Sequence, residues 1–177
     1  MAETRQVTPA VEPGDTEEMV LRITADKGGR EIAINRVLDA RRESVWRAMT
    51  DPTLLQRWWG PKDLQTTIEK FEARPGGIWR ILQRDGAGKE YGFHGVFHDI
   101  EPMERIVQTF EYEGAPGHVS LQTTTLEGRN GKTVVDTMSV FQSDEDRDAM
   151  IAAGMERGVR ESIERLLDLL DELEESD

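Results

Sequence analysis

Hydrophobic and polar residues alternate along the first part of the chain in the way that a β-strand requires. The segment REIAINRVLDA, residues 30–40, places Ile32 and Ile34 two apart with smaller or polar residues between them. This period of two predicts a strand. Residues 19–23 are a weaker candidate for a preceding strand. Residues 1–18 are rich in Pro, Glu, Thr and Gly, and we expect a flexible tail there.

The pattern becomes helical after residue 41. Val45, Trp46 and Met49 share one face of a helix predicted over residues 42–50. Asp51-Pro52 ends that helix and supplies the cap and first residue of a second one, TLLQRWW, which ends at Gly60-Pro61. Two short helices therefore follow the first strand as a kinked pair.

Six more strands are predicted in the middle of the chain. They cover residues 64–72, 78–83, 91–100, 105–112, 118–127 and 132–141. The segments that separate them contain Gly, Asn or Pro, which supply the backbone angles of tight turns. Short consecutive strands joined in this way predict an antiparallel meander.

The C-terminal part predicts one long amphipathic helix over residues 144–172, capped by Ser143 or Asp144. At ~1.5 Å per residue it would be ~40 Å long. Gly154 and Gly158 interrupt it, and we expect them to permit a close approach to the sheet or to leave space above a cavity. The apolar stripe consists of Ala152, Met155, Val159, Ile163, Leu166, Leu170 and Leu173.

A run of strands followed by a long helix predicts an α+β fold. We expect a helix-grip: a curved antiparallel sheet of about six or seven strands wrapped around the C-terminal helix, with two short helices after the first strand. Residues 19–177 are predicted to form a single domain. A curled sheet that grips one helix leaves a space between them.

Four segments carry a family resemblance. They are EIAINRVLDARRESVWRAMTDPTLLQRWWGP, RPGGIWR, FHGVFHDIEPMERIVQTFEYEG and FQSDEDRDAMIAAGMERGVRESIERLLDLL, in this order. Over residues 30–173 the chain resembles the START/SRPBCC superfamily (birch-pollen-allergen-like), and within it the branch named after the activator of heat-shock protein 90 ATPase. The resemblance implies the helix-grip fold. Members of the superfamily include lipid carriers, polyketide cyclases, hormone receptors and co-chaperones, so it names no single activity.

Composition narrows the function classes. The 177 residues carry a net charge of −13 and include no Cys. Disulfides and thiolate chemistry are therefore excluded. No basic run offers a site for nucleic acid, and no apolar run approaches the ~18 residues of a membrane span. We expect no nucleic-acid partner, no membrane insertion and a cytoplasmic location.

Catalytic and metal-binding patterns are missing. His94 and His98 lie four apart on a predicted strand, which separates them by ~13 Å and is too far for two ligands of one zinc ion. The sequence contains no nucleophile-elbow, P-loop or dinucleotide motif. We therefore predict no catalytic residue, no metal and no cofactor.

Aromatic residues are the strongest candidates for ligand contacts, although an aromatic residue on a strand also serves as ordinary core. Alternation places Phe93 and Phe97 on one face of their strand and His94 and His98 on the other, without deciding which face is inward. The predicted ligand-binding residues are Trp59, Trp79, Phe93, His94, Phe97, Phe110, Tyr112, Met138, Met155 and Val159.

Polar residues on the strands offer a way to orient a ligand; they are Gln83, Gln108, Gln122, Asp136 and Thr137. Asp136 lies between Val134 and Met138 in an otherwise apolar row. If that row is inward, Asp136 is a buried acid and a candidate site residue. We favour the alternative, in which the row faces water and Val135, Thr137, Ser139 and Phe141 face inward.

Three functions remain open. The first is a binding module that holds a small apolar or aromatic molecule between helix and sheet. The second is an enzyme of the cyclase or hydrolase kind that uses a pocket His or acid. The third is a co-chaperone-like interaction domain, as the family name suggests. A homodimer is compatible with all three.

Overall fold

The computed structural model describes residues 21–176. The predicted tail at residues 1–18 and the first two residues of the weakest predicted strand, Met19 and Val20, lie outside the described residues. The rest of that strand is present as β1 (Leu21–Thr24).

One antiparallel sheet of eight strands forms most of the molecule, in the order β1-β2-β8-β7-β6-β5-β4-β3. The α+β helix-grip prediction is therefore confirmed, with eight strands instead of six or seven because β1 pairs with β2 along Leu21–Thr24. After β1 the strands are β2 (Glu31–Leu38), β3 (Gln65–Phe71), β4 (Ile78–Arg84), β5 (Glu90–Glu101), β6 (Arg105–Tyr112), β7 (Val119–Arg129) and β8 (Lys132–Phe141).

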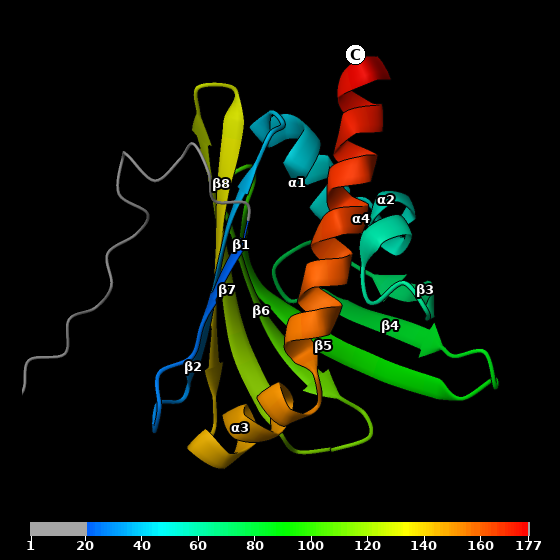
Figure 1. The fold of residues 1–177 in the computed structure, drawn as a ribbon, viewed down its shortest axis with the longest axis vertical. Helices are drawn as coiled ribbons and strands as arrows, with labels where there is room; N and C mark the ends of the chain where they lie inside the picture. Colours follow the sequence, from blue (N-terminus) through cyan, green and yellow to red (C-terminus); the bar gives the residue numbers. More distant parts are fainter. Residues whose placement is uncertain (1–20, 177) are drawn as a thin grey trace, which may run out of the picture.

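Four helices lie on the concave side or at the ends of this sheet. They are α1 (Arg42–Thr50), α2 (Pro52–Trp58), α3 (Asp144–Ala152) and α4 (Met155–Ser176). The α1–α2 pair connects β2, near one edge of the sheet, with β3 at the other edge. Figure 1 shows α4 along the hollow of the curved sheet, with α1 and α2 beside its C-terminal half and α3 near its start.

The prediction of one continuous C-terminal helix is wrong. Gly154 adopts a φ of +85° between α3 and α4, a left-handed angle that ends a helix and suits glycine. The amide of Gly154 donates to the carbonyl of Ile151 at 3.1 Å, and that of Ala153 donates to Ala149 at 3.0 Å. The chain therefore turns between α3 and α4.

The predicted helix caps are confirmed. The Asp51 carboxylate accepts a hydrogen bond from the amide of Thr53 at 2.9 Å at the start of α2. The Ser143 hydroxyl accepts one from the amide of Asp146 at 3.1 Å at the start of α3. Both caps satisfy amides that have no partner inside their helix.

The middle of α4 anchors the helix on the sheet. Four of its side chains, Ile163, Leu166, Leu169 and Leu170, are at most 3% exposed, and burial of each contributes about 2 kcal/mol. Their buried partners from the sheet and from α1 and α2 include Leu38, Val45, Leu55, Trp58, Ile106, Leu126 and Val135. Toward its start α4 presents only the half-buried Met155 and Val159 to a separate small cluster formed by Ile32, Ile34 and Phe141.

Candidate ligand-binding site

Strand register decides which residues face α4. Trp79 pairs with Gly95 in β4–β5, and Phe93 pairs with Tyr112 in β5–β6. Paired residues share a face of the sheet, and Trp79 belongs to the core under α4 with 3% exposure. Phe93, Phe110 and Tyr112 therefore point toward the concave face.

Five aromatic side chains meet on this face, and we call them the aromatic cluster. Phe93 lies at its centre, with ring centroids 5.3 Å from Trp59, 5.6 Å from Phe110 and 5.2 Å from Tyr112. Trp79 joins through Phe110 at 5.9 Å. These separations and tilted or edge-on arrangements are the ones that aromatic pairs prefer. The cluster unites β4, β5 and β6 with the end of α2.

Two glycines beside the tryptophans of the aromatic cluster have no space for a side chain. A Cβ atom on Gly95 would overlap the carbonyl of Thr109 and lie 2.7 Å from Nε1 of Trp79. Gly60, next to Trp59, has a φ of +86°, and a Cβ there would overlap the Gln83 amide. The backbone contact at Gly95 and the left-handed angle at Gly60 therefore both favour glycine.

Three further predicted residues also face inward but lie outside the aromatic cluster. Phe97 is 2% exposed and contacts Phe71 at 5.4 Å between centroids, so it belongs to the packed core. Met155 and Val159, on the first turns of α4, pack against the small cluster around Ile32.

His94 and Met138 were predicted as site residues, and the structure places neither on the concave face. His94 alternates with the inward Phe93 along β5 and is hydrogen bonded on the convex face. Met138 follows the inward Thr137 on β8 and is 39% exposed. Both predictions are wrong because a strand turns successive side chains to opposite faces, and the sequence did not settle which face was inward.

On the convex face His94 belongs to a network of charged side chains. Its Nδ1 lies 3.1 Å from a Glu113 carboxylate oxygen and its Nε2 lies 3.3 Å from Glu111. Arg80 donates two hydrogen bonds to Glu113, at 2.8 and 2.9 Å. These bonds from Arg80, helped by His94, lower the pKa of the Glu113 carboxyl to about 2.

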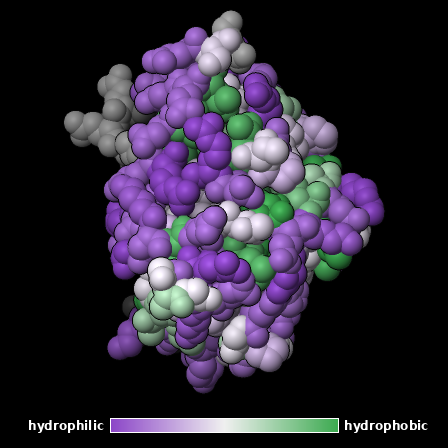
Figure 2. Space-filling model, turned by 90° about the vertical axis from the view of Figure 1, so that its right-hand side faces the viewer, coloured by the Kyte–Doolittle hydropathy of each residue, from purple (hydrophilic) through white to green (hydrophobic). Residues whose placement is uncertain are grey.

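The inward face is incompletely covered. Trp59, Phe93, Phe110 and Tyr112 are half-buried although they point toward α4. Water therefore reaches part of the aromatic cluster. Figure 2, which views the molecule from the side of α2, β3 and β4, shows hydrophobic residues gathered in the middle of that face with hydrophilic residues around them.

Beside the aromatic cluster the concave face carries polar side chains, which we call the polar band. Its members are Arg36, Gln108, Ser120, Gln122, Thr124, Thr137 and Ser139. Gln108 donates to Gln122 at 3.3 Å, and the hydroxyls of Thr124 and Thr137 lie 2.9 Å apart. Gln108, Gln122 and Thr137 were predicted as polar residues of the strands, and the three share this face.

Arg36 is the charged member of the polar band, and the sequence interpretation missed it. It is 9% exposed, and Nη2 donates to the Thr137 hydroxyl at 2.6 Å. Burial lowers the pKa of its guanidinium to about 10, and attraction by Asp136 opposes that shift. The signal was present in the sequence, because the alternation that places Ile32, Ile34 and Leu38 inward also places residue 36 inward.

Asp136 faces away from this site, as we favoured. Its carboxylate accepts a hydrogen bond from the Asn35 side chain at 2.8 Å, while the neighbouring Val135 is fully buried in the core. His98 is exposed on the convex face and His118 is exposed beside Asp146, at 2.7 Å. The His and the acid that the enzyme hypothesis invoked therefore lie outside the site.

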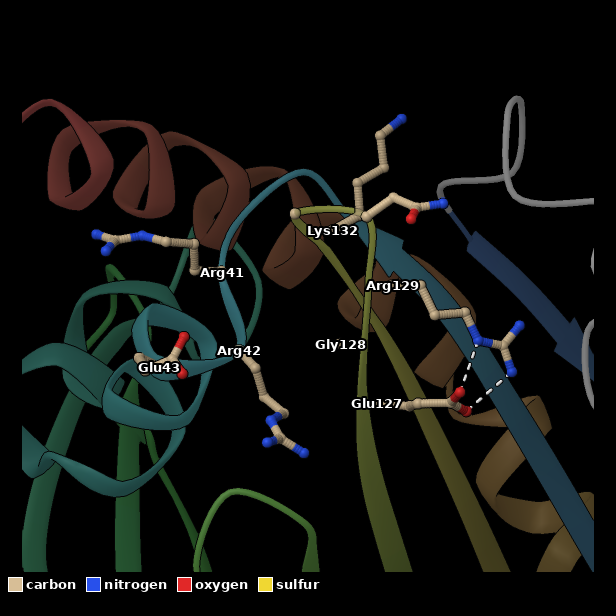
Figure 3. Close-up of a pocket in the computed structure, with 9 residues that line it drawn as sticks. Arg41, Arg42, Glu43, Glu127, Gly128, Arg129 and Lys132 are labelled. Atoms are coloured by element: carbon tan, nitrogen blue, oxygen red, sulfur yellow. Dashed lines mark hydrogen bonds and ion pairs between the residues drawn. The ribbon is translucent and has the colours of Figure 1, made fainter.

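Two surface recesses lie elsewhere, beside α1 and the β7–β8 hairpin. The first has a volume of about 380 Å³ and is lined by Arg41, Arg42, Glu43 and residues 127–132. Figure 3 shows that most of its side chains are charged and that Arg129 pairs with Glu127 at the end of β7. The second, of about 390 Å³, is lined mainly by charged and polar residues around Arg105. Neither recess has the aromatic lining expected for an apolar ligand.

Within residues 21–176 no helix is both long enough and apolar enough to cross a membrane. The same residues contain no group of three or more His, Asp or Glu side chains that is arranged to hold a metal ion.

Comparison with known proteins identifies a family whose model matches this sequence. Residues 39–171 match the family model described as activator of Hsp90 ATPase homolog 1-like protein. A protein from Arthrobacter aurescens has a TM-score of 0.79 at 30% identity, covering 86% of this chain and 92% of its own. One from Rhodobacter sphaeroides has a TM-score of 0.77 at 26% identity, covering 86% and 99%.

DynU16, from the dynemicin biosynthetic locus, has a TM-score of 0.61 at 19% identity, covering 80% of this chain and 47% of its own, a likeness of fold alone. No curated protein matches this chain.

Proposed function

This chain belongs to the activator of Hsp90 ATPase homolog 1-like family, and from its helix-grip fold we propose that it binds a small, largely apolar or aromatic molecule. The ligand lies between the first turns of α4 and the concave face of the sheet. The observation that carries the proposal is the aromatic cluster, which faces inward while four of its five members, all except Trp79, remain partly open to water.

Physical chemistry supports this site. Aromatic side chains provide large areas of apolar surface. A ligand that covers the part exposed to water gains binding free energy from the hydrophobic effect. The polar band beside the cluster supplies a few hydrogen-bonding groups among apolar ones, which is the usual composition of small-molecule sites. The middle of α4 is already packed on the core, so a ligand need not displace it.

Binding is tested with a neutral fluorescent probe, N-phenyl-1-naphthylamine, and by thermal unfolding with and without the probe. We expect saturable binding, energy transfer from Trp59 and Trp79, and a higher unfolding temperature. At a probe concentration of 100 times Kd the stabilisation is about 2.7 kcal/mol.

A matched pair of variants locates the probe. Phe93→Leu removes the central ring of the aromatic cluster and keeps apolar volume, and it should weaken binding by roughly 2- to 10-fold. Phe71→Leu makes the same change in an aromatic pair with Phe97, outside the cluster, and should leave affinity unchanged. Equal effects of the two variants, or no saturable binding, would contradict the proposal.

A further inference from the structure

A positive charge is buried where this strand pattern calls for an apolar side chain. Arg36 occupies the inward row of β2 between Ile34 and Leu38 and is 9% exposed. A buried charge costs several kcal/mol unless it is paired and hydrogen bonded. Arg36 therefore requires a compensating group.

Among residues 21–176, that group is missing. One hydrogen bond from Nη2 reaches the neutral hydroxyl of Thr137 at 2.6 Å, and Nε is buried with no partner. Asp136 attracts the guanidinium at a distance, but its carboxylate is hydrogen bonded to Asn35 on the opposite face. No described carboxylate forms an ion pair with Arg36.

The polar band connects Arg36 with the aromatic cluster. Thr137, the partner of Arg36, contacts Thr124, and Ser120 on the same strand as Thr124 is paired with Phe110 of the aromatic cluster. From β2 to β6 the sheet has three strand spacings, or about 14 Å at ~4.8 Å each, and Ser120 lies four residues from Thr124 along β7, a further ~13 Å at ~3.3 Å per residue. The Ser120 hydroxyl and the Trp79 Nε1 are also buried without partners, so unsatisfied donors occur at both ends of this path.

We propose that the ligand is an amphipathic organic acid, whose apolar body lies on the aromatic cluster and whose carboxylate is bound by Arg36. This inference rests on the proposed function and deepens it. A carboxylate accepts from Nε and Nη2 together in the paired geometry that guanidinium groups favour. It also supplies the missing counter-charge.

The charge of the whole chain makes this preference unusual. With a net charge of −13, long-range electrostatics repel anions from the surface. A preference for an acid over its neutral analogue therefore requires a local cation such as Arg36.

The test compares acids with their alcohols on the full chain. Isothermal titration calorimetry at pH 8 measures dodecanoate against 1-dodecanol, and 4-biphenylacetate against 2-(4-biphenylyl)ethanol. We expect one site per chain and at least a tenfold preference for the acid in one pair or both, because a charge-assisted hydrogen bond is lost in the alcohol.

Variants assign the preference to Arg36. Arg36→Met should bring acid and alcohol within twofold of each other while alcohol binding persists, and Arg36→Lys should keep part of the preference. Arg22→Met is the matched control, because Arg22 is exposed and pairs with Asn35 on the opposite face; it should retain the full preference.

Each outcome decides between the two proposals. Equal binding of acid and alcohol by the unaltered chain overturns the role of Arg36 and leaves the proposed function standing. Binding of neither member of either pair overturns both. A preference that survives in Arg36→Met overturns the assignment to Arg36. The comparison on the unaltered chain decides the question even if a variant fails to fold.

Discussion

At the residue scale, Arg36 lowers the stability of the ligand-free protein and provides the charge that binds the carboxylate of the proposed ligand. Its guanidinium is 9% exposed with one neutral hydrogen-bond partner, whereas every other member of its row is aliphatic. Residues that reduce the stability of the free protein are typical of binding sites, because the ligand supplies the hydrogen-bond partner or counter-charge that the fold lacks.

Arg36→Met should therefore make the ligand-free protein more stable, by about 1 kcal/mol at neutral pH. The substitution removes an uncompensated buried charge and keeps a side chain of similar length. Thr137 retains the Thr124 hydroxyl as a partner. Urea unfolding of both proteins measures the difference, and a loss of stability would instead identify Arg36 as a structural residue.

At the element scale, the joint between α3 and α4 determines where the C-terminal helix begins to follow the sheet. Gly154 has a φ of +85° at this joint, and Gly158 lies in the first turn of α4. A Cβ atom at either position meets nothing within 4 Å. The two glycines therefore differ in backbone conformation and not in available space.

This difference predicts opposite effects for the same substitution. Gly154→Ala should lower the free energy of unfolding by about 1 kcal/mol, because alanine resists a left-handed angle. Gly158→Ala should raise it by up to about 1 kcal/mol, because alanine is the better helix former. Thermal unfolding of the two variants in parallel measures both, and changes of the same sign would contradict this account of the joint.

The positions of the strands and helices could be predicted from the sequence better than which face of each strand points inward. Turn residues placed the strand ends, and alternation correctly grouped Phe93 with Phe97 and separated them from His94. Choosing the inward face of β5 required the pairing of Gly95 with Trp79 and the burial of Trp79 in the core with α4, and α4 is far from β5 in the chain. The break at Gly154 was missed because the apolar stripe continues on both sides of it.

At the scale of the whole molecule, acidic residues dominate the surface, and pH acts on stability through the few that are held ionised. Glu113 is the clearest case: Arg80 and His94 lower its pKa from 4.5 to about 2. A carboxyl with a lowered pKa stabilises the native state fully above its ordinary value of 4.5. That contribution disappears as the pH falls from about 4.5 to about 2.

Glu113→Gln should thus lower the free energy of unfolding by about 1 kcal/mol at pH 7, the scale of a partly exposed ion pair. The difference between variant and parent should shrink below pH 4.5 and vanish near pH 2. Chemical unfolding across this range measures it. A difference that stays constant with pH would show that the Glu113 charge is not responsible.

The end of α2 is hydrogen bonded to the middle of α4. The amide of Gly60 donates to the Ser162 hydroxyl at 2.9 Å, and Arg165 donates to the carbonyl of Gly60 at 3.2 Å. Trp59 directly precedes Gly60 and contributes its ring to the aromatic cluster, which forms a wall of the proposed ligand site. The position of the Trp59 indole is therefore tied to α4, so a ligand that contacts this indole does so against a wall held in place by the helix, and the emission of Trp59 reports whether that wall keeps its position.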